Sequence, residues 1–103
     1  MKTVIMPGPC KMKTEVETEK IDRNTVSIKI KTDCKFYKPL EEELKQVDLY
    51  KECFLPLGEG NIFKTCKKYC KHPSCPIPCG ILKAVEAEGG LALPTDVYIS
   101  FEK

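Results

Sequence analysis

Two runs of alternating apolar and polar residues, on either side of a short polar turn, constrain the fold of this chain most strongly. Val16 and Thr18 alternate with glutamates in the first run, and Val26, Ile28 and Ile30 alternate with a serine and lysines in the second. An alternation with a period of two is typical of strands that have one buried face. The pattern therefore predicts a strand hairpin and an antiparallel sheet.

The charges on the two runs predict one register for this hairpin. If the turn is centred near Asp22 to Asn24, Val16 faces Ile30 and Glu17 faces Lys29. Apolar residues then share one face, opposite charges meet on the other, and a shift by one residue would destroy both matches.

The same register, continued toward the open end of the hairpin, brings two distant cysteines together. Met12 would lie opposite Cys34, and Cys10 would be a diagonal neighbour on the same face at roughly 7–8 Å. The sequence thus predicts that Cys10 and Cys34 converge.

The rest of the chain predicts three helices and further strands. The helices are expected around Leu40 to Val47, from about Ile62 to Lys71, and from Pro76 to the glycines at 89 and 90; the strands are expected at Val97 to Phe101 and before Pro7. We therefore expect an α+β fold in one domain, residues 1–103. Its antiparallel sheet has three to four strands, the N-terminal hairpin plus the C-terminal strand, with about three helices packed on one face.

The composition limits the class of protein. The chain has 17 basic and 15 acidic residues, and its net charge of +2 is too close to balance for nucleic acid or an anionic membrane to be the main partner. No apolar run approaches the ~18 residues that span a bilayer, and none of signal-peptide length precedes Cys10. We expect a cytoplasmic protein whose thiols are reduced.

Seven cysteines in 103 residues indicate that sulfur has a function here: Cys10, Cys34, Cys53, Cys66, Cys70, Cys75 and Cys79. Their odd number argues against the disulfide framework of a secreted protein. The spacing CxxxCxHxxCxxxC lacks the CxxC pairs of zinc ribbons and does not match ferredoxin spacing.

Position along the chain distinguishes the cysteines better than spacing does. Cys34 and Cys75 each lie beside the N-terminus of an expected helix, where the helix dipole favours the thiolate. With Cys10 they are the preferred ligands of a metal site. The fourth ligand is Cys79, one helical turn beyond Cys75, or His72, and spacing does not choose between them.

The other cysteines have a simpler interpretation. Cys66 and Cys70 share a helix face with Ile62 and Tyr69, which suits core packing as well as it suits ligation. Cys53, beside a phenylalanine, is interpreted as a core residue.

Three motifs resemble a family of small uncharacterised proteins of methanogenic archaea and other anaerobes: PGPC, then TDC ahead of a helix, then HPSCP opening a later helix. The similarity runs to the GGLALPTDV segment, and the family brings no established activity. The layout is more remotely similar to U-type iron-sulfur cluster scaffolds (IscU and the N-terminal domain of NifU). On that resemblance Cys10, Cys34 and Cys75 take the ligand positions, and His72 takes the place of the nearby histidine.

The chain departs from the scaffold pattern at two points. Pro73 and Ser74 separate His72 from Cys75, whereas the scaffold histidine directly precedes its cysteine. The acidic residue that follows the first scaffold cysteine is also missing, because lysines and a methionine follow Cys10.

These observations predict a non-enzymatic protein that binds an iron-sulfur cluster through Cys10, Cys34 and Cys75 plus Cys79 or His72. Its partner would be another protein that donates or accepts the cluster. One alternative is a structural or regulatory zinc site that uses overlapping thiolates. The other is a thiol enzyme or sulfur carrier with Cys75 or Cys34 as nucleophile, although the chain offers no convincing catalytic base.

Overall fold

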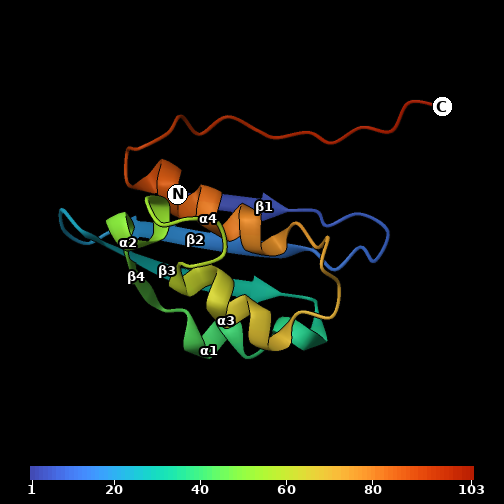
Figure 1. The fold of residues 1–103 in the computed structure, drawn as a ribbon, viewed down its shortest axis with the longest axis horizontal. Helices are drawn as coiled ribbons and strands as arrows, with labels where there is room; N and C mark the ends of the chain where they lie inside the picture. Colours follow the sequence, from blue (N-terminus) through green and yellow to red (C-terminus); the bar gives the residue numbers. More distant parts are fainter.

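The computed structural model describes residues 1–103 and is an α+β fold, with helices on one face of an antiparallel sheet (Figure 1). The sheet order is β1-β2-β3-β4, and every neighbouring pair is antiparallel. The strands are β1 (Lys2–Ile5), β2 (Thr14–Lys20), β3 (Thr25–Thr32) and β4 (Gln46–Asp48). The helices are the 3-10 turn η1 (Lys35–Tyr37), α1 (Leu40–Glu43), α2 (Leu49–Cys53), α3 (Asn61–Tyr69) and α4 (Ile77–Glu88).

The predicted hairpin register is confirmed. Val16 pairs with Ile30, and Glu17 pairs with Lys29. Both apolar side chains are buried under the helices, whereas the charged pair lies on the solvent face. Cross-strand charge pairs and one buried face together fix this register.

The hairpin ladder ends earlier than its extrapolation predicted. The last pair is Thr14 with Thr32, so Met12 and Cys34 are not paired residues. The cause lies in the segment before β2, where Lys11 has a left-handed backbone with φ of 58° and the chain leaves the strand conformation. The two arms nevertheless stay close, as the site described below shows.

The first predicted helix is divided by a short strand. α1 stops before Lys45, and β4 then pairs with β3, which places Val47 opposite Val26. The Asp48 carboxylate accepts hydrogen bonds from the backbone N–H groups of Tyr50 and Lys51, each at 3.1 Å, and so begins α2. The prediction of one helix through Val47 was wrong. Val47 is the one buried residue of β4, and its spacing of three from Leu44 looks the same in the sequence as a further turn of helix.

The predicted C-terminal strand is not part of the sheet. The fourth strand is β4, and the residues from Val97 to Phe101 form no ladder. After Gly90, whose φ is 80°, the chain turns back and runs extended beyond α4 and β1, roughly parallel to the strands but outside the sheet (Figure 1). A strand requires the backbone of a neighbour as well as an alternating sequence, and this copy provides no neighbour there.

The two later helices occur where they were predicted, and α4 lies against β1 and β2. The approach is close, because a Cβ added to Gly80 would lie 2.5 Å from Cδ1 of Ile5. This contact fixes the start of α4, and with it Cys75, near the open end of the hairpin. None of the helices combines the length and the apolar character that crossing a bilayer requires.

Candidate functional site

A cavity of about 380 Å³ collects four of the seven cysteines beside the open end of the β2–β3 hairpin. Three separate stretches of chain supply its mainly hydrophobic lining: the loop before β2, the end of β3 with η1, and the connection between α3 and α4. Its cysteines are Cys10, Cys34, Cys70 and Cys75, and it is named the thiol cavity below. Its walls would hold a bound group partly out of water.

A chain of hydrogen bonds positions Cys34. Its backbone N–H donates to the Thr32 hydroxyl at 3.1 Å, and that hydroxyl lies 2.7 Å from the hydroxyl of Thr14. The Thr14 hydroxyl also lies 3.5 Å from the Met12 carbonyl oxygen, to which it can donate. The chain links the two arms of the hairpin where each enters the thiol cavity.

One carbonyl oxygen organises the connection between α3 and α4. The carbonyl of His72 accepts hydrogen bonds from the Cys70 thiol at 2.9 Å and from the Cys75 N–H at 3.0 Å. Both cysteines are thereby brought to the same wall of the thiol cavity. The His72 side chain is exposed and lines the cavity from its rim.

The Tyr37 hydroxyl is the least satisfied polar group near this site. Tyr37 is 2% exposed and lines the thiol cavity, and its hydroxyl makes no hydrogen bond of ordinary geometry. Burial raises the pKa of this hydroxyl well above its ordinary value, and weak hydrogen bonding to the thiols of Cys70 and Cys75 raises the pKa further. A buried donor without an acceptor costs about 1–3 kcal/mol. The hydroxyl is therefore placed to donate to a charged sulfur or to a ligand in the cavity.

Two lysines lie at the mouth of the cavity. The ammonium groups of Lys35 and Lys71 lie 5.3 and 6.0 Å from the ring centre of Phe36, and all three residues line the cavity. The aromatic ring holds both cations near the thiols. Asp33 on the same lining offsets part of this charge. Two lysines against one aspartate leave the lining positively charged, which attracts an anionic bound group.

The structure brings together the three cysteines that the sequence preferred. Cys10, Cys34 and Cys75 line one cavity, and His72 lines it as well. The predicted pairing of Met12 with Cys34 was wrong, because the ladder ends at Thr14 and Thr32. The predicted convergence of Cys10 and Cys34 is confirmed, because both line the thiol cavity.

Cys79 does not line the cavity, and Cys70 does. Cys79 is exposed in the first turn of α4, whereas Cys70 ends α3, its N–H bonded to the Cys66 carbonyl at 2.8 Å. The signal for Cys70 is the short KHPS connection to Cys75, which cannot separate the two residues widely. The sequence left Cys70 open between core packing and ligation, because its helix face suits both.

The remaining two cysteines are packing residues. Cys66 is 1% exposed, and burial raises the pKa of its thiol to about 12, with Cys70 and Cys75 contributing. Burial likewise raises the pKa of Cys53 to about 11, helped by Glu86 and Glu52. Both thiols stay protonated at neutral pH and behave as small apolar groups.

The spacing of the thiols does not suit a single ion as it stands. No three His, Cys, Asp or Glu side chains form a group that could hold one metal ion. Zinc requires each sulfur at about 2.3 Å, so the cavity walls would have to close around it. A polynuclear cluster separates its thiolates more widely, because iron and sulfide lie between them.

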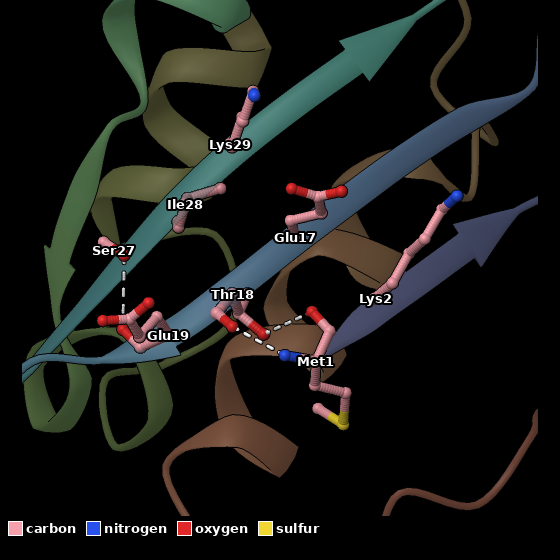
Figure 2. Close-up of a pocket in the computed structure, with 8 residues that line it drawn as sticks. All are labelled: Met1, Lys2, Glu17, Thr18, Glu19, Ser27, Ile28 and Lys29. Carbon is pink, nitrogen blue, oxygen red and sulfur yellow. Dashed lines mark hydrogen bonds between the residues drawn. The ribbon is translucent and has the colours of Figure 1, made fainter.

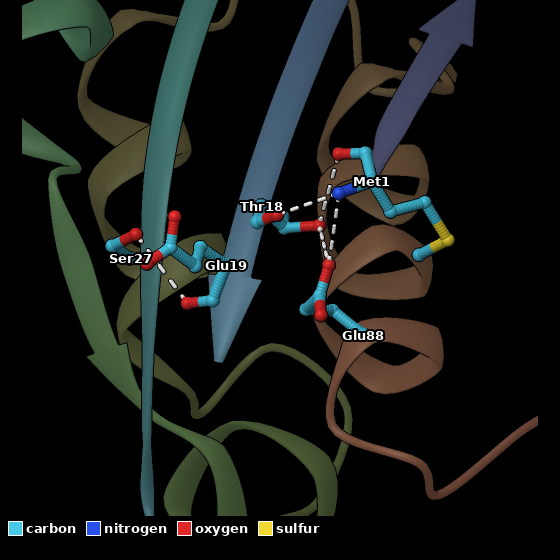
Figure 3. Close-up of polar contacts among 5 residues, drawn as sticks. All are labelled: Met1, Thr18, Glu19, Ser27 and Glu88. Carbon is cyan, nitrogen blue, oxygen red and sulfur yellow. Dashed lines mark hydrogen bonds and ion pairs between the residues drawn. The ribbon is translucent and has the colours of Figure 1, made fainter. Parts of the chain in front are cut away.

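A second hollow, of about 510 Å³, lies across β2 and β3 and carries no thiol or imidazole (Figure 2). Its polar groups bond to one another and to α4 (Figure 3). The Met1 ammonium group lies 3.1 Å from Glu88 Oε1, and the Thr18 hydroxyl donates to the same oxygen at 3.0 Å. These contacts join α4 to the sheet, so we assign them a structural role.

The chain belongs to a protein family described as a family of unknown function (DUF6951), whose model matches residues 1–101. Neither the curated proteins nor the solved structures give a match. The resemblance to U-type scaffolds therefore stays a prediction.

Proposed function

We propose that this protein binds an iron-sulfur cluster in the thiol cavity, with Cys10, Cys34, Cys70 and Cys75 as thiolate ligands. The observation that carries the proposal is the buried hydroxyl of Tyr37, which makes no hydrogen bond of ordinary geometry and lies beside the thiols of Cys70 and Cys75 in a cavity lined by four thiols. Folding leaves such a donor without an acceptor only at a cost, and a cluster sulfur or a ligating thiolate would remove that cost.

The chemistry of the lining supports this choice. Thiolates are the preferred ligands of iron-sulfur clusters, and four of them from three stretches of chain can surround a polynuclear group. Hydrogen bonds and nearby positive charge tune such a cluster, and Tyr37, Lys35 and Lys71 are placed to supply them.

We propose a carrier or scaffold in the cytoplasm rather than an enzyme. Cys10 lies exposed on a loop, so one ligand is accessible to an incoming thiol of a partner protein. Thiolate exchange at an exposed ligand is the simplest route by which a cluster passes between proteins. The partner would donate or accept the cluster.

Anaerobic purification, followed by analysis of iron, acid-labile sulfide and zinc, tests the proposal. We expect iron and sulfide in near-equal amounts and a visible absorption band, before or after reconstitution. Serine substitution of any of the four cavity cysteines should strip the cluster from folded protein. The matched control is Cys79→Ser, which changes an exposed cysteine outside the cavity and should retain the cluster.

The same measurements show how the proposal could fail. Folded protein without iron or sulfide after reconstitution would contradict it. Stoichiometric zinc that depends on the same cysteines would replace it with a zinc site. Loss of the cluster in Cys79→Ser with retention in Cys70→Ser would restore Cys79 as the fourth ligand.

A further inference from the structure

The segment that follows α4 exposes more large apolar side chains than any other part of the chain. Leu93, Tyr98, Ile99 and Phe101 are each about four-fifths exposed or more, and Val97 is 58% exposed. The segment is extended and forms no ladder, and the molecule measures 43 Å along its longest axis against 29 and 25 Å along the others. Apolar residues grouped in this way mark a surface that another group covers.

The sequence of this segment has the period of a strand. Val97, Ile99 and Phe101 fall on one face, and Tyr98 and Ser100 fall on the other. The backbone is already extended, so docking as a strand needs little ordering. What the segment lacks is a neighbouring strand with free backbone groups.

The outer edge of β1 offers such backbone groups. Met1 and Thr18 exchange both hydrogen bonds of a ladder pair, each at 2.8 Å. In an antiparallel ladder these pairs alternate, so Thr3 also faces β2 while the N–H and C=O groups of Lys2 and Val4 face outward. No backbone hydrogen bond joins those groups to any other part of the chain. Open edges of this kind accept added strands.

The segment matches the edge of the sheet in polarity. Ile5 of β1 is buried on the helix side of the sheet, whereas Lys2 and Val4 lie on the solvent side. If Val97, Ile99 and Phe101 lie on the helix side, then Asp96, Ser100 and Glu102 lie on the solvent side, where Lys2 pairs with Glu15. The pattern of the segment therefore continues the pattern of the sheet.

The area is sufficient for a stable pair of chains. Burying Phe101 on the helix side removes about 150–250 Å² from water in each copy, and the surface that it covers on the other copy adds a similar amount. Val97 and Ile99 are buried on the same side, and with a reciprocal exchange their area brings the sum toward the lower end of the range of about 1,200–2,000 Å² of stable interfaces.

We infer that residues 96–102 of one copy add as a strand to the outer edge of β1 in a second copy, and that the exchange is reciprocal. A second copy supplies one edge for every segment, and a two-fold axis closes the assembly so that no apolar segment is left over. This inference concerns the sheet and is independent of the cluster. In its own copy the segment runs on the β1 side of the sheet, roughly parallel to the strands, without pairing with β1 (Figure 1).

Light scattering of the full chain in the presence of reductant, so that no disulfide links the copies, tests the inference together with amide hydrogen exchange. We expect a dimer, with slow exchange in alternate residues of the segment 97–101 and at Val4. Ile99→Asp should weaken association at least about tenfold, because a carboxylate enters the buried face. Leu57→Asp is the matched control, since Leu57 is 89% exposed on a loop outside the proposed interface.

A second variant tests the edge itself. Val4→Pro removes an outward N–H without removing a bond to β2, so it should separate the copies while the circular dichroism spectrum stays unchanged. A monomer with freely exchanging segment amides would overturn the inference. A monomer with protected segment amides would do so too, because the strand would then pair with its own copy. A dimer that survives both Ile99→Asp and Val4→Pro would also overturn it.

Discussion

The hydroxyl oxygens of Thr14 and Thr32 lie 2.7 Å apart in the last pair of the β2–β3 ladder, where both side chains are fully buried. This pair stands directly below the thiol cavity. Through it, the backbone of Cys34 is linked to the opposite arm of the hairpin. The polar pair therefore transmits the geometry of the sheet to the site.

Thr32→Val should weaken both the fold and the site. The variant keeps the shape but leaves the Cys34 N–H without its acceptor, which costs about 1–3 kcal/mol of unfolding free energy. Cluster content per folded molecule should fall as well, because Cys34 is no longer held in place. Urea denaturation and iron analysis measure the two effects, and unchanged iron content would show that the hydrogen bond does not position the ligand.

Tyr37→Phe should separate stability from cofactor binding. In the metal-free protein the change removes an unpartnered hydroxyl, so stability should stay equal or rise. In the loaded protein it removes a hydrogen bond to sulfur, so the reduction potential should become more negative and the cluster should be lost faster. A variant that is less stable without metal and unchanged with it would contradict this role.

Alkylation of the metal-free protein should divide the thiols by burial. Cys66 and Cys53, with pKa values raised to about 12 and about 11, should react slowly at neutral pH and faster as the pH rises. Cys79 is the exposed control, and denaturation should accelerate Cys66 far more than Cys79. Peptide mapping by mass spectrometry measures each rate.

The same pKa shift predicts how stability depends on pH. The folded state holds the Cys66 proton more tightly than the unfolded state, whose value is near 9.0. The buried, protonated Cys66 thiol therefore makes its full contribution to the free energy of unfolding below about pH 9, and this contribution is lost as the pH rises toward about 12. Cys66→Ala should reduce this part of the alkaline loss when the two proteins are compared by thermal denaturation, and an unchanged profile would contradict the shift.

Glu52→Gln should loosen α3. The buried carboxylate accepts hydrogen bonds from the N–H groups of Asn61 and Ile62 at 3.0 and 2.8 Å, which are the first free donors of that helix. We expect a loss of about 1–3 kcal/mol and faster amide exchange in α3. Glu42→Gln, which changes an exposed carboxylate paired only with Lys45, is the control and should have little effect.

The sequence predicted the hairpin and its register because charge pairs and a buried face allow one alignment. It predicted that Cys10, Cys34 and Cys75 meet because two of them followed from that register. It did not predict β4, since three residues are too few to show a period. The sequence left the role of Cys70 open, and its prediction of a C-terminal strand in the sheet was wrong. In both cases the contacts of the residue or strand depend on neighbours that the local pattern does not contain.

The cavity cysteines come from stretches that begin at residue 10 and end at residue 75. A group that bonds to all of them would act as a covalent clamp between the hairpin and α4, and would close long loops that the unfolded chain leaves open. Chelation would thus couple the lifetime of the fold to the supply of iron and sulfide. A cell short of either would hold this protein in a looser form, more exposed to proteolysis.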